Sequence, residues 1–337
     1  MNCCGCFSAI SRRSKVPLKR YNLLTTDIWA PPKVIAEEVQ NGVLSKGMMR
    51  RIGNLAEYAE KNPHRIPKIA RRLERRARKE LGAQRYGYVH VAAWGYIEVT
   101  KASSQHLHLY ARHIFDFATL LFKHRLQEMN VLGARLMQGY FALEGDTTFM
   151  REMEGYVPLI QQVAKNISPA TGGGDEDAKQ LRYRTTVLES LREFVGLLGR
   201  TQYISSKSLD LVYEVALMQS SATTSNSERD SISLNEVSLA MSEKKSVELQ
   251  PIQSQDSVDK LARSLVADIA KLAKDAATAR IVVEPFVRFC DANQWWLSKE
   301  KLVFVYLDIL HTALLGTQQH YVLISTLVRH LRTPTVM

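Results

Sequence analysis

Three of the four cysteines in this 337-residue sequence lie within its first six residues, at Cys3, Cys4 and Cys6. A thiol can be acylated, and each methylene of the acyl chain that enters a bilayer contributes about 0.8 kcal/mol. One chain binds a membrane reversibly, whereas two chains, or one chain with a basic patch, anchor a protein stably. The cluster therefore predicts lipidated cysteines at the cytosolic face of a membrane.

Basic residues follow the cysteines directly and would strengthen such an anchor. They are Arg12, Arg13, Lys15, Lys19 and Arg20, and the first acidic residue is Asp27. Each Lys or Arg near an anionic leaflet contributes about 1 kcal/mol, which salt screens. Residues 1–20 are thus predicted to form a lipidated, basic N-terminal anchor.

Other uses of the terminal cysteines fit the sequence less well. Three ligands within four residues do not form a closed zinc cage, and the fourth cysteine, Cys290, lies far away in an apolar stretch. Four cysteines without a secretory context do not indicate a disulfide framework. Asn2 excludes myristoylation, and the apolar run Phe7–Ile10 is too short for a signal peptide. Inert terminal thiols remain the open alternative.

A second concentration of positive charge lies in Arg65–Leu81, which has a helical period. Asn62 is predicted to cap this helix, with Pro63 at its first position. One face is apolar and consists of Ile66, Ile69, Ala70, Leu73, Ala77 and Leu81. The opposite face carries the cations Arg65, Lys68, Arg71, Arg72, Arg75, Arg76, Arg78 and Lys79. Because a merely solvated face needs less charge, we expect this face to bind phospholipid headgroups or nucleic acid.

The distribution of charge along the chain favours lipid over nucleic acid. Residues 1–85 contain 19 Lys and Arg against seven Asp and Glu, and the whole chain has a net charge of +11. The basic surface is thus confined to the first repeat, whereas RNA-binding solenoids repeat base-reading side chains along the array. We expect anionic membrane lipids as partners and no nucleic acid. A cytosolic or nuclear adaptor for RNA or acidic proteins is the alternative.

Motifs for catalysis are not found in the sequence. It contains no His-Glu-x-x-His pattern, no phosphate-binding Gly loop and no nucleophile elbow. His106 and His108 are two residues apart and do not share a helical face, so the histidines are expected to be surface or capping residues. Trp295 and Trp296 are expected in helix packing and a turn. The sequence predicts no enzyme, no metal site and no cofactor.

Helical periodicity over almost the whole chain predicts an all-α fold. Helices are expected near 46–61, 65–81, 85–102, 105–124, 127–144, 148–167, 177–199, 204–218, 258–279, 281–293, 298–316 and 319–332. Their lengths, their short connections and a pair spacing of about 40 residues indicate an armadillo- or HEAT-like helical-repeat solenoid. This solenoid is expected over residues 21–218 and again over 258–332.

Residues 219–257 interrupt the helical pattern. The segment is rich in Ser and poor in aromatic residues, which predicts a disordered insertion with candidate phosphorylation sites. The chain ends soon after an apolar helix, without the polar capping helix of a solenoid, which predicts that a longer array is cut at Met337. No apolar run is long enough for a transmembrane helix.

Several segments resemble the Rolling blackout family in its plant-type form, whose members also begin with a cysteine cluster. Near the N-terminus they are Lys19–Trp29 (KRYNLLTTDIW), Asn54–Asn62 (NLAEYAEKN) and Asn62–Leu81 (NPHRIPKIARRLERRARKEL). Val283–Trp296 and Gln318–Leu331 resemble a second block of the family. The similarity runs in order across most of the chain and is weakest in the Ser-rich insertion.

The resemblance implies a peripheral, non-enzymatic scaffold at the cytoplasmic face of the plasma membrane, which anchors the type III alpha phosphatidylinositol 4-kinase complex. It implies palmitoylation of Cys3, Cys4 and Cys6 and contact between acidic lipids and the basic residues named above. A tetratricopeptide-repeat scaffold would bridge to the kinase. Family members are much longer, and their C-terminal region, which engages that scaffold, is not matched here, so we expect this chain to carry the membrane-binding part.

Overall fold

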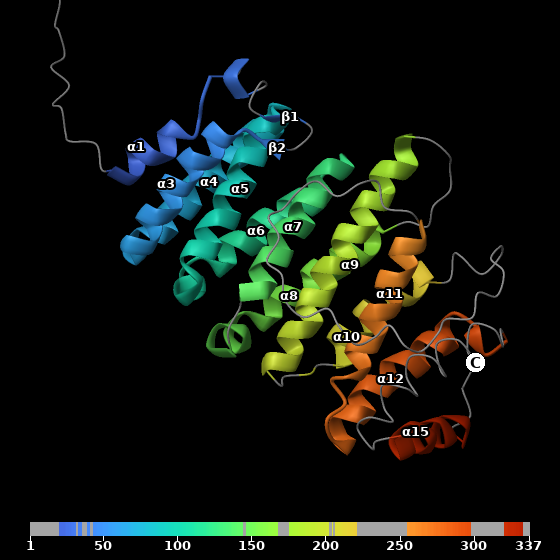
Figure 1. Ribbon diagram of the computed structural model, residues 1–337. Coiled ribbons are helices and arrows are strands. Elements are labelled where there is room, and N and C mark those ends of the chain that lie inside the picture. Colours follow the sequence, from blue (N-terminus) through green and yellow to red (C-terminus); the bar gives the residue numbers. More distant parts are fainter. Residues whose placement is uncertain are drawn as a thin grey trace, which may run out of the picture.

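Apolar residues three and four positions apart give each segment a helix with a buried side, and the helices stack on these sides. The computed structural model describes residues 20–31, 33–35, 39–40, 43–143, 146–167, 175–201, 204, 206–220, 255–297 and 320–332. Its helices are α1 (Arg20–Asp27), α3 (Lys46–Lys61), α4 (Ile66–Gly82), α5 (Tyr86–Ala102), α6 (Ala111–Phe122), α7 (Gln127–Leu143), α8 (Asp146–Asn166), α9 (Asp175–Thr201), α10 (Ser206–Ser220), α11 (Gln255–Ala270), α12 (Ala276–Ala292) and α15 (His320–Arg332) (Figure 1). The shorter elements are the 3-10 turns η1 (Pro63–Arg65), η2 (Ser104–Leu109) and η4 (Trp295–Leu297), and an antiparallel ribbon of β1 (Val39–Gln40) and β2 (Val43–Leu44).

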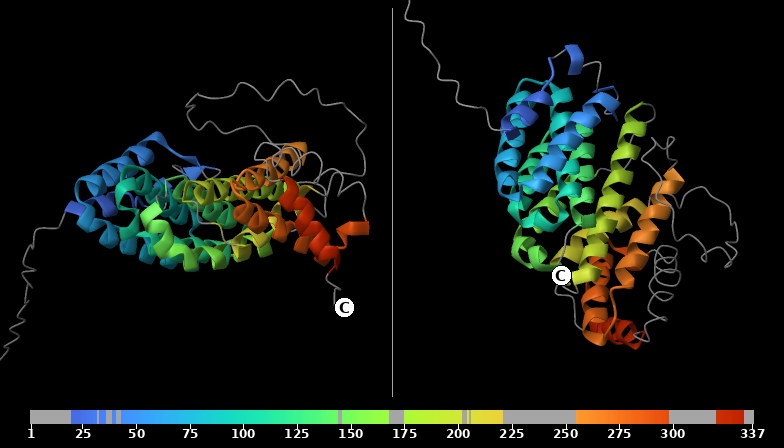
Figure 2. Two further views of the ribbon diagram at one scale, coloured as in Figure 1. Left: turned by 90° about the horizontal axis from the view of Figure 1, so that it is seen from below. Right: turned by 60° about the vertical axis from the view of Figure 1, so that its left-hand side comes forward.

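The helices form two layers. In one layer α3, α5, α7, α9 and α11 pack side by side in this order, and in the other α4, α6, α8, α10, α12 and α15 do the same. The colours in Figures 1 and 2 accordingly run from one end of the stack to the other, with α1 beside α3 and α4 at the first end. α3, α5 and α7 begin at Lys46, Tyr86 and Gln127, which confirms the predicted spacing of about 40 residues. The described residues confirm the helical-repeat solenoid.

Aromatic rings fill the core where α6, α7, α8 and α9 meet. The ring of Phe115 lies 5.1 Å, centroid to centroid, from those of Tyr140 and Tyr156, both edge to face. Phe141 lies 5.1 Å from Phe194. All five rings are buried, and each pair adds about 0.5–1.5 kcal/mol to the free energy of burial. The cluster therefore joins the helix pair α7 and α8 to the helices before and after it.

Most predicted helix positions are confirmed within a few residues, but two are wrong. The helix expected over 258–279 ends at Ala270, and α12 begins at Ala276. The break arises because Asp275 and Thr278 form a capping box, with Thr278 N donating to Asp275 Oδ1 at 2.7 Å. The helix expected over 105–124 is divided into η2 and α6, since the backbone of Tyr110 between them is not helical (φ −142°, ψ 4°).

Some predictions fall outside the described residues. They include the helix expected over 298–316 and nearly all of the insertion expected over 219–257. At its borders, α10 continues to Ser220 and α11 begins at Gln255, so helical structure reaches slightly into the predicted insertion from both sides. None of the helices that the structure describes is long and apolar enough to cross a membrane.

Candidate anion-binding surface

The apolar face predicted for α4 is buried. Its six members are at most 8 % exposed: Ile66, Ile69, Ala70, Leu73, Ala77 and Leu81. This face packs on α5 and α6, and Tyr96 Oη of α5 donates to the backbone oxygen of Ala70 at 2.7 Å. Because the apolar face is fixed in this way, most cations of α4 point to the surface.

The predicted cap of α4 is wrong. The side chain of Asn62 instead donates to the backbone oxygen of Tyr58 at 3.0 Å, which closes the end of α3. The 3-10 turn η1 follows, and α4 begins only at Ile66, with Pro67 in its first turn. A turn therefore precedes the basic helix, and α4 packs beside α1.

Four cations of α4 are free to bind an external anion. Lys68, Arg71, Arg75 and Lys79 are exposed, and among the residues that the structure describes none of them forms an ion pair or a hydrogen bond. They follow one another at intervals of three and four residues, so they line one side of the helix over about three turns. We call them the free-cation stripe. Like charges in such a line attract anions from solution.

The other arginines in the middle of α4 have partners within the protein. Arg72 donates through Nη1 to Asn22 Oδ1 at 2.5 Å and through Nη2 to Thr26 Oγ1 at 3.4 Å, which ties α4 to α1. Arg78 Nη2 lies 2.7 Å from Glu74 Oε1, and the other oxygen of Glu74 lies 3.0 Å from His113 Nδ1 in α6. These side chains hold neighbouring elements together.

A buried carboxylate holds Arg76. The side chain of Glu80 is 1 % exposed, and its two oxygens lie 2.8 Å from Arg76 Nε and 2.9 Å from Arg85 Nε. The guanidinium of Arg76 also lies over the rings of Trp29 and Tyr88, at 5.8 and 5.4 Å from the centroids. Such cation–π contacts contribute about 0.5–1 kcal/mol each. Arg76 thus neutralises a buried charge and packs against aromatic rings.

The cations at the beginning of the surface rest on aromatic rings. Arg20, the first residue of α1, lies 5.9 Å from the ring centroid of Tyr58, and Arg65 lies at the same distance from that of Tyr21. The Tyr88 hydroxyl in α5 donates to the backbone oxygen of Ala30 at 2.8 Å, directly after α1. These contacts fix α1 and the residues after it against α3, η1 and α5.

The predicted anchor itself lies outside the described residues. This holds for the predicted lipidation sites Cys3, Cys4 and Cys6 and for the basic residues Arg12, Arg13, Lys15 and Lys19. Arg20 is the one member of the predicted N-terminal basic run that the structure describes. It opens α1, so the predicted anchor enters the fold next to α4.

The other residues whose side chains could react or bind a ligand take part in packing instead. Cys290 is buried in α12, and burial raises the pKa of its thiol to about 12. Trp295 is buried against Phe289 at 4.9 Å between ring centroids, whereas Trp296 is partly exposed and donates through Nε1 to Asp291 Oδ1 at 2.7 Å. The described residues hold no group of three or more His, Cys, Asp or Glu side chains that could bind a metal ion.

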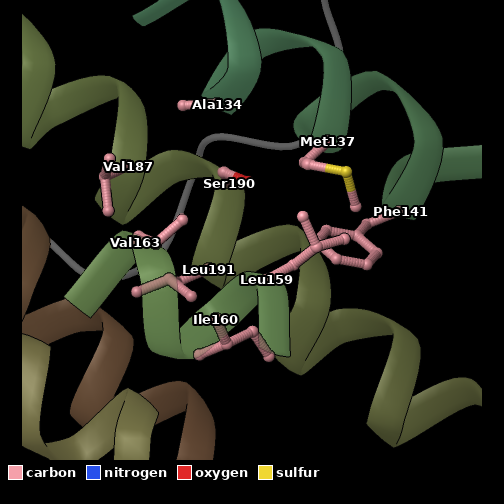
Figure 3. Close-up of a pocket in the computed structure, with 9 residues that line it drawn as sticks. All are labelled: Ala134, Met137, Phe141, Leu159, Ile160, Val163, Val187, Ser190 and Leu191. Carbon is pink, nitrogen blue, oxygen red and sulfur yellow. The ribbon is translucent and has the colours of Figure 1, made fainter. Parts of the chain in front are cut away.

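An internal pocket between α7, α8 and α9 is too small for a ligand. Figure 3 shows its lining, which includes Met137, Phe141, Leu159 and Ile160 and is apolar apart from Ser190. Its volume is about 10 Å³. A space of this size holds one water molecule at most, so the pocket is a small packing gap.

The sequence did not predict that α1 and Glu80 bind arginines of this surface. Arg72 and Asn22 are separated by 50 residues, and no local pattern reveals such a pair. Glu80 gave a usable signal, because it follows Ala77 by three residues and Leu73 by seven, which places it on the buried side of the helix. An acidic residue on that side of a basic helix indicates an internal ion pair.

Comparisons with known proteins identify the family of this chain. The family described as "EFR3, armadillo repeat" matches residues 52–335. The rice protein SEMI-ROLLED LEAF 2 (Oryza sativa subsp. japonica) is 20 % identical over 359 residues, which cover 99 % of this chain and 34 % of the rice protein. The chain thus spans about a third of the length of this relative, and no solved structure matches it. Armadillo repeats build helical scaffolds, in agreement with the two-layered stack. The family match covers most of the chain and confirms the resemblance found in the sequence, so the chain belongs to the EFR3 armadillo-repeat family.

Proposed function

We propose that this chain is a peripheral scaffold that binds the cytoplasmic face of the plasma membrane. Acyl groups on Cys3, Cys4 and Cys6 would anchor it, and the basic surface would contact acidic lipids. By resemblance to its family, the bound scaffold would position a phosphatidylinositol 4-kinase complex through a tetratricopeptide-repeat partner. The observation that carries the proposal is the free-cation stripe, which lies on the helix next to the point where the predicted anchor joins the fold.

The free-cation stripe is the part of the basic surface that is available to lipids. Arg72, Arg76 and Arg78 already have partners in the protein. Each cation near an anionic leaflet contributes about 1 kcal/mol, so the four free cations together contribute about 4 kcal/mol, which is roughly a thousandfold in affinity. Single lipid contacts are weak, but the stripe and two acyl chains would together hold the scaffold at the membrane.

Binding to vesicles tests the contribution of the stripe. We expect the non-acylated chain to bind vesicles of phosphatidylcholine with phosphatidylserine, and more weakly as salt is raised. Exchange of Lys68, Arg71, Arg75 and Lys79 for Gln should weaken this binding by two to three orders of magnitude. The matched control exchanges four exposed lysines outside the basic surface for Gln and removes the same charge. They are Lys123, Lys207, Lys260 and Lys274. Equal affinity of the two variants would contradict the proposal, and preferential binding of single-stranded RNA would favour the adaptor alternative.

The acyl anchor is tested in cells with a fluorescent fusion of the full chain. We expect the unaltered fusion at the plasma membrane and the variant with Ser at Cys3, Cys4 and Cys6 in the cytosol, because the stripe alone binds reversibly. Acyl exchange chemistry on the isolated fusion should label the unaltered chain and not the variant. A variant that stays at the plasma membrane would remove thiol acylation from the proposal.

A further inference from the structure

One large apolar side chain is exposed at the end of the solenoid where the basic surface lies. Leu23 of α1 is 51 % exposed, and it is the one exposed large hydrophobic residue in the described parts of α1, α3 and α4. Leu23 and Leu24 line a shallow surface hollow of about 430 Å³ together with Thr26 and Asp27. A single exposed Leu is common on protein surfaces. What distinguishes Leu23 is the set of charges around it.

The orientation of α1 is fixed, so Leu23 points away from the protein. Thr25 is fully buried on the opposite side of α1 from the outward positions Arg20 and Leu23, and Ile28 is fully buried directly after the helix. α1 packs on both α3 and α4. Arg72 holds it through Asn22 and Thr26, on either side of Leu23 in the sequence. The helix therefore cannot turn Leu23 inward without breaking these contacts.

The surroundings of Leu23 are cationic. Arg20 lies on the same side of α1 one turn earlier, and Arg72, which bonds to both flanks of Leu23, belongs to the same helix as the free-cation stripe. Asp27 is the acidic residue on this side, one turn after Leu23. An exposed apolar side chain beside Arg20 and Arg72 fits the boundary between headgroups and acyl chains, where amphipathic elements lie about 5–10 Å deep.

We propose that Leu23 inserts into the acyl region of an anionic bilayer and that Arg20 and the free-cation stripe contact the headgroups around it. This inference rests on the proposed membrane binding and adds to it an orientation, in which α1 faces the lipid. The distance along the chain agrees with this orientation. The fourteen residues from Cys6 to Arg20 span at most about 50 Å, so an acylated terminus would hold this end of the solenoid close to the bilayer.

A reporter at position 23 tests the insertion directly. In Leu23→Trp we expect tryptophan emission to shift to shorter wavelength on phosphatidylserine-containing vesicles, and lipids brominated on the acyl chains should quench it beyond the quenching of the unaltered chain. The matched control is Ile324→Trp, because Ile324 is 54 % exposed in α15, at the opposite end of the stack from α1 and α4. Both positions are at the surface, so both variants should fold. The control should show no extra quenching.

A second variant measures the effect on affinity. Leu23→Ser should weaken vesicle binding by about fourfold to tenfold, since about half of a Leu side chain is transferred from water. The dependence of binding on salt should stay unchanged, because no charge is removed. If vesicles bind the chain normally while Leu23→Trp is not quenched and Leu23→Ser binds as tightly, the insertion is refuted and the proposed membrane binding stands. If anionic vesicles do not bind the chain at all, both proposals fail.

Discussion

Removal of both cations beside Glu80 would leave a buried carboxylate without a counter-charge. Glu80 is 1 % exposed, and its ion pairs with Arg76 and Arg85 are 2.8 and 2.9 Å long. A buried charge that loses its partner costs about 3–5 kcal/mol. We therefore expect Arg76→Gln with Arg85→Gln to lower the free energy of unfolding by this amount.

Substitution of Glu80 itself should lower the free energy of unfolding by less, because the side chains of the two arginines reach water. The side chains of Arg76 and Arg85 are 37 % and 48 % exposed, so after Glu80→Gln both guanidinium groups stay solvated. We expect a loss of about 1–2 kcal/mol for this variant. Adding Glu80→Gln to the double Arg variant should restore most of its stability, since no buried charge then remains.

Urea unfolding followed by far-ultraviolet circular dichroism measures these differences, and hydrogen exchange of the α4 amides shows where stability is lost. The control is Arg71→Gln with Arg75→Gln, which removes two charges from the free-cation stripe of the same helix. This control should change stability by no more than about 0.5 kcal/mol. A double Arg76 and Arg85 variant as stable as the control, or one that Glu80→Gln does not rescue, would refute the reasoning.

Two further predictions concern the packing of the middle repeats. Burial and the charges of Arg135 and Arg182 lower the pKa of His90 to about 4 from 6.5. Between these two pH values the unfolded chain therefore binds a proton at His90 that the folded chain does not bind. Stability present above pH 6.5 should therefore fall by up to about 3 kcal/mol as the pH drops toward 4, and His90→Gln should flatten this part of the urea midpoint profile; an unchanged profile would contradict it. Gly133→Ala places a Cβ atom 3.2 Å from Phe122 Cε1 and 3.3 Å from Leu121 Cβ, which should cost about 1–3 kcal/mol in urea unfolding. Gly53→Ala has open space around it and should stabilise α3 by about 0.5–1 kcal/mol, so equal effects of the two substitutions would argue against close contact of α6 with α7.

Features set by local sequence were predicted well. The two faces of α4 follow from a period of 3.6 residues, which acts within one helix and needs no knowledge of the rest of the chain. The same holds for the repeat spacing, because helix lengths and turn residues are local. The break at Asp275 was missed although it is local, since the apolar pattern continues past it while the capping box ends the preceding helix.

Features set by contacts between distant segments were not predicted. The sequence shows eight equivalent cations over residues 65–81, but in the structure Arg65 lies in η1, and the seven on α4 divide into four free cations and three held by Asn22, Glu74 and Glu80. Arg76 and Arg78 meet Glu80 and Glu74 four residues away on the same helix, whereas the partners of Arg72 depend on how α1 docks on α4. That geometry arises from packing of the whole end of the stack. A count of charges therefore overstates how much of the basic face is available to external anions.

The close packing of α10 and α11 has a consequence for the connection between them. These helices contact each other although a long stretch of sequence separates Ser220 from Gln255. Each doubling of a connecting loop costs only about 0.6 kcal/mol of closure entropy. The lateral contacts of α11 with α9 and α10, and of α12 with α10, therefore hold the two parts together more than the covalent link does. Sequence added at this junction should therefore cost little stability, because the lateral contacts stay in place and only the closure entropy of the connection changes.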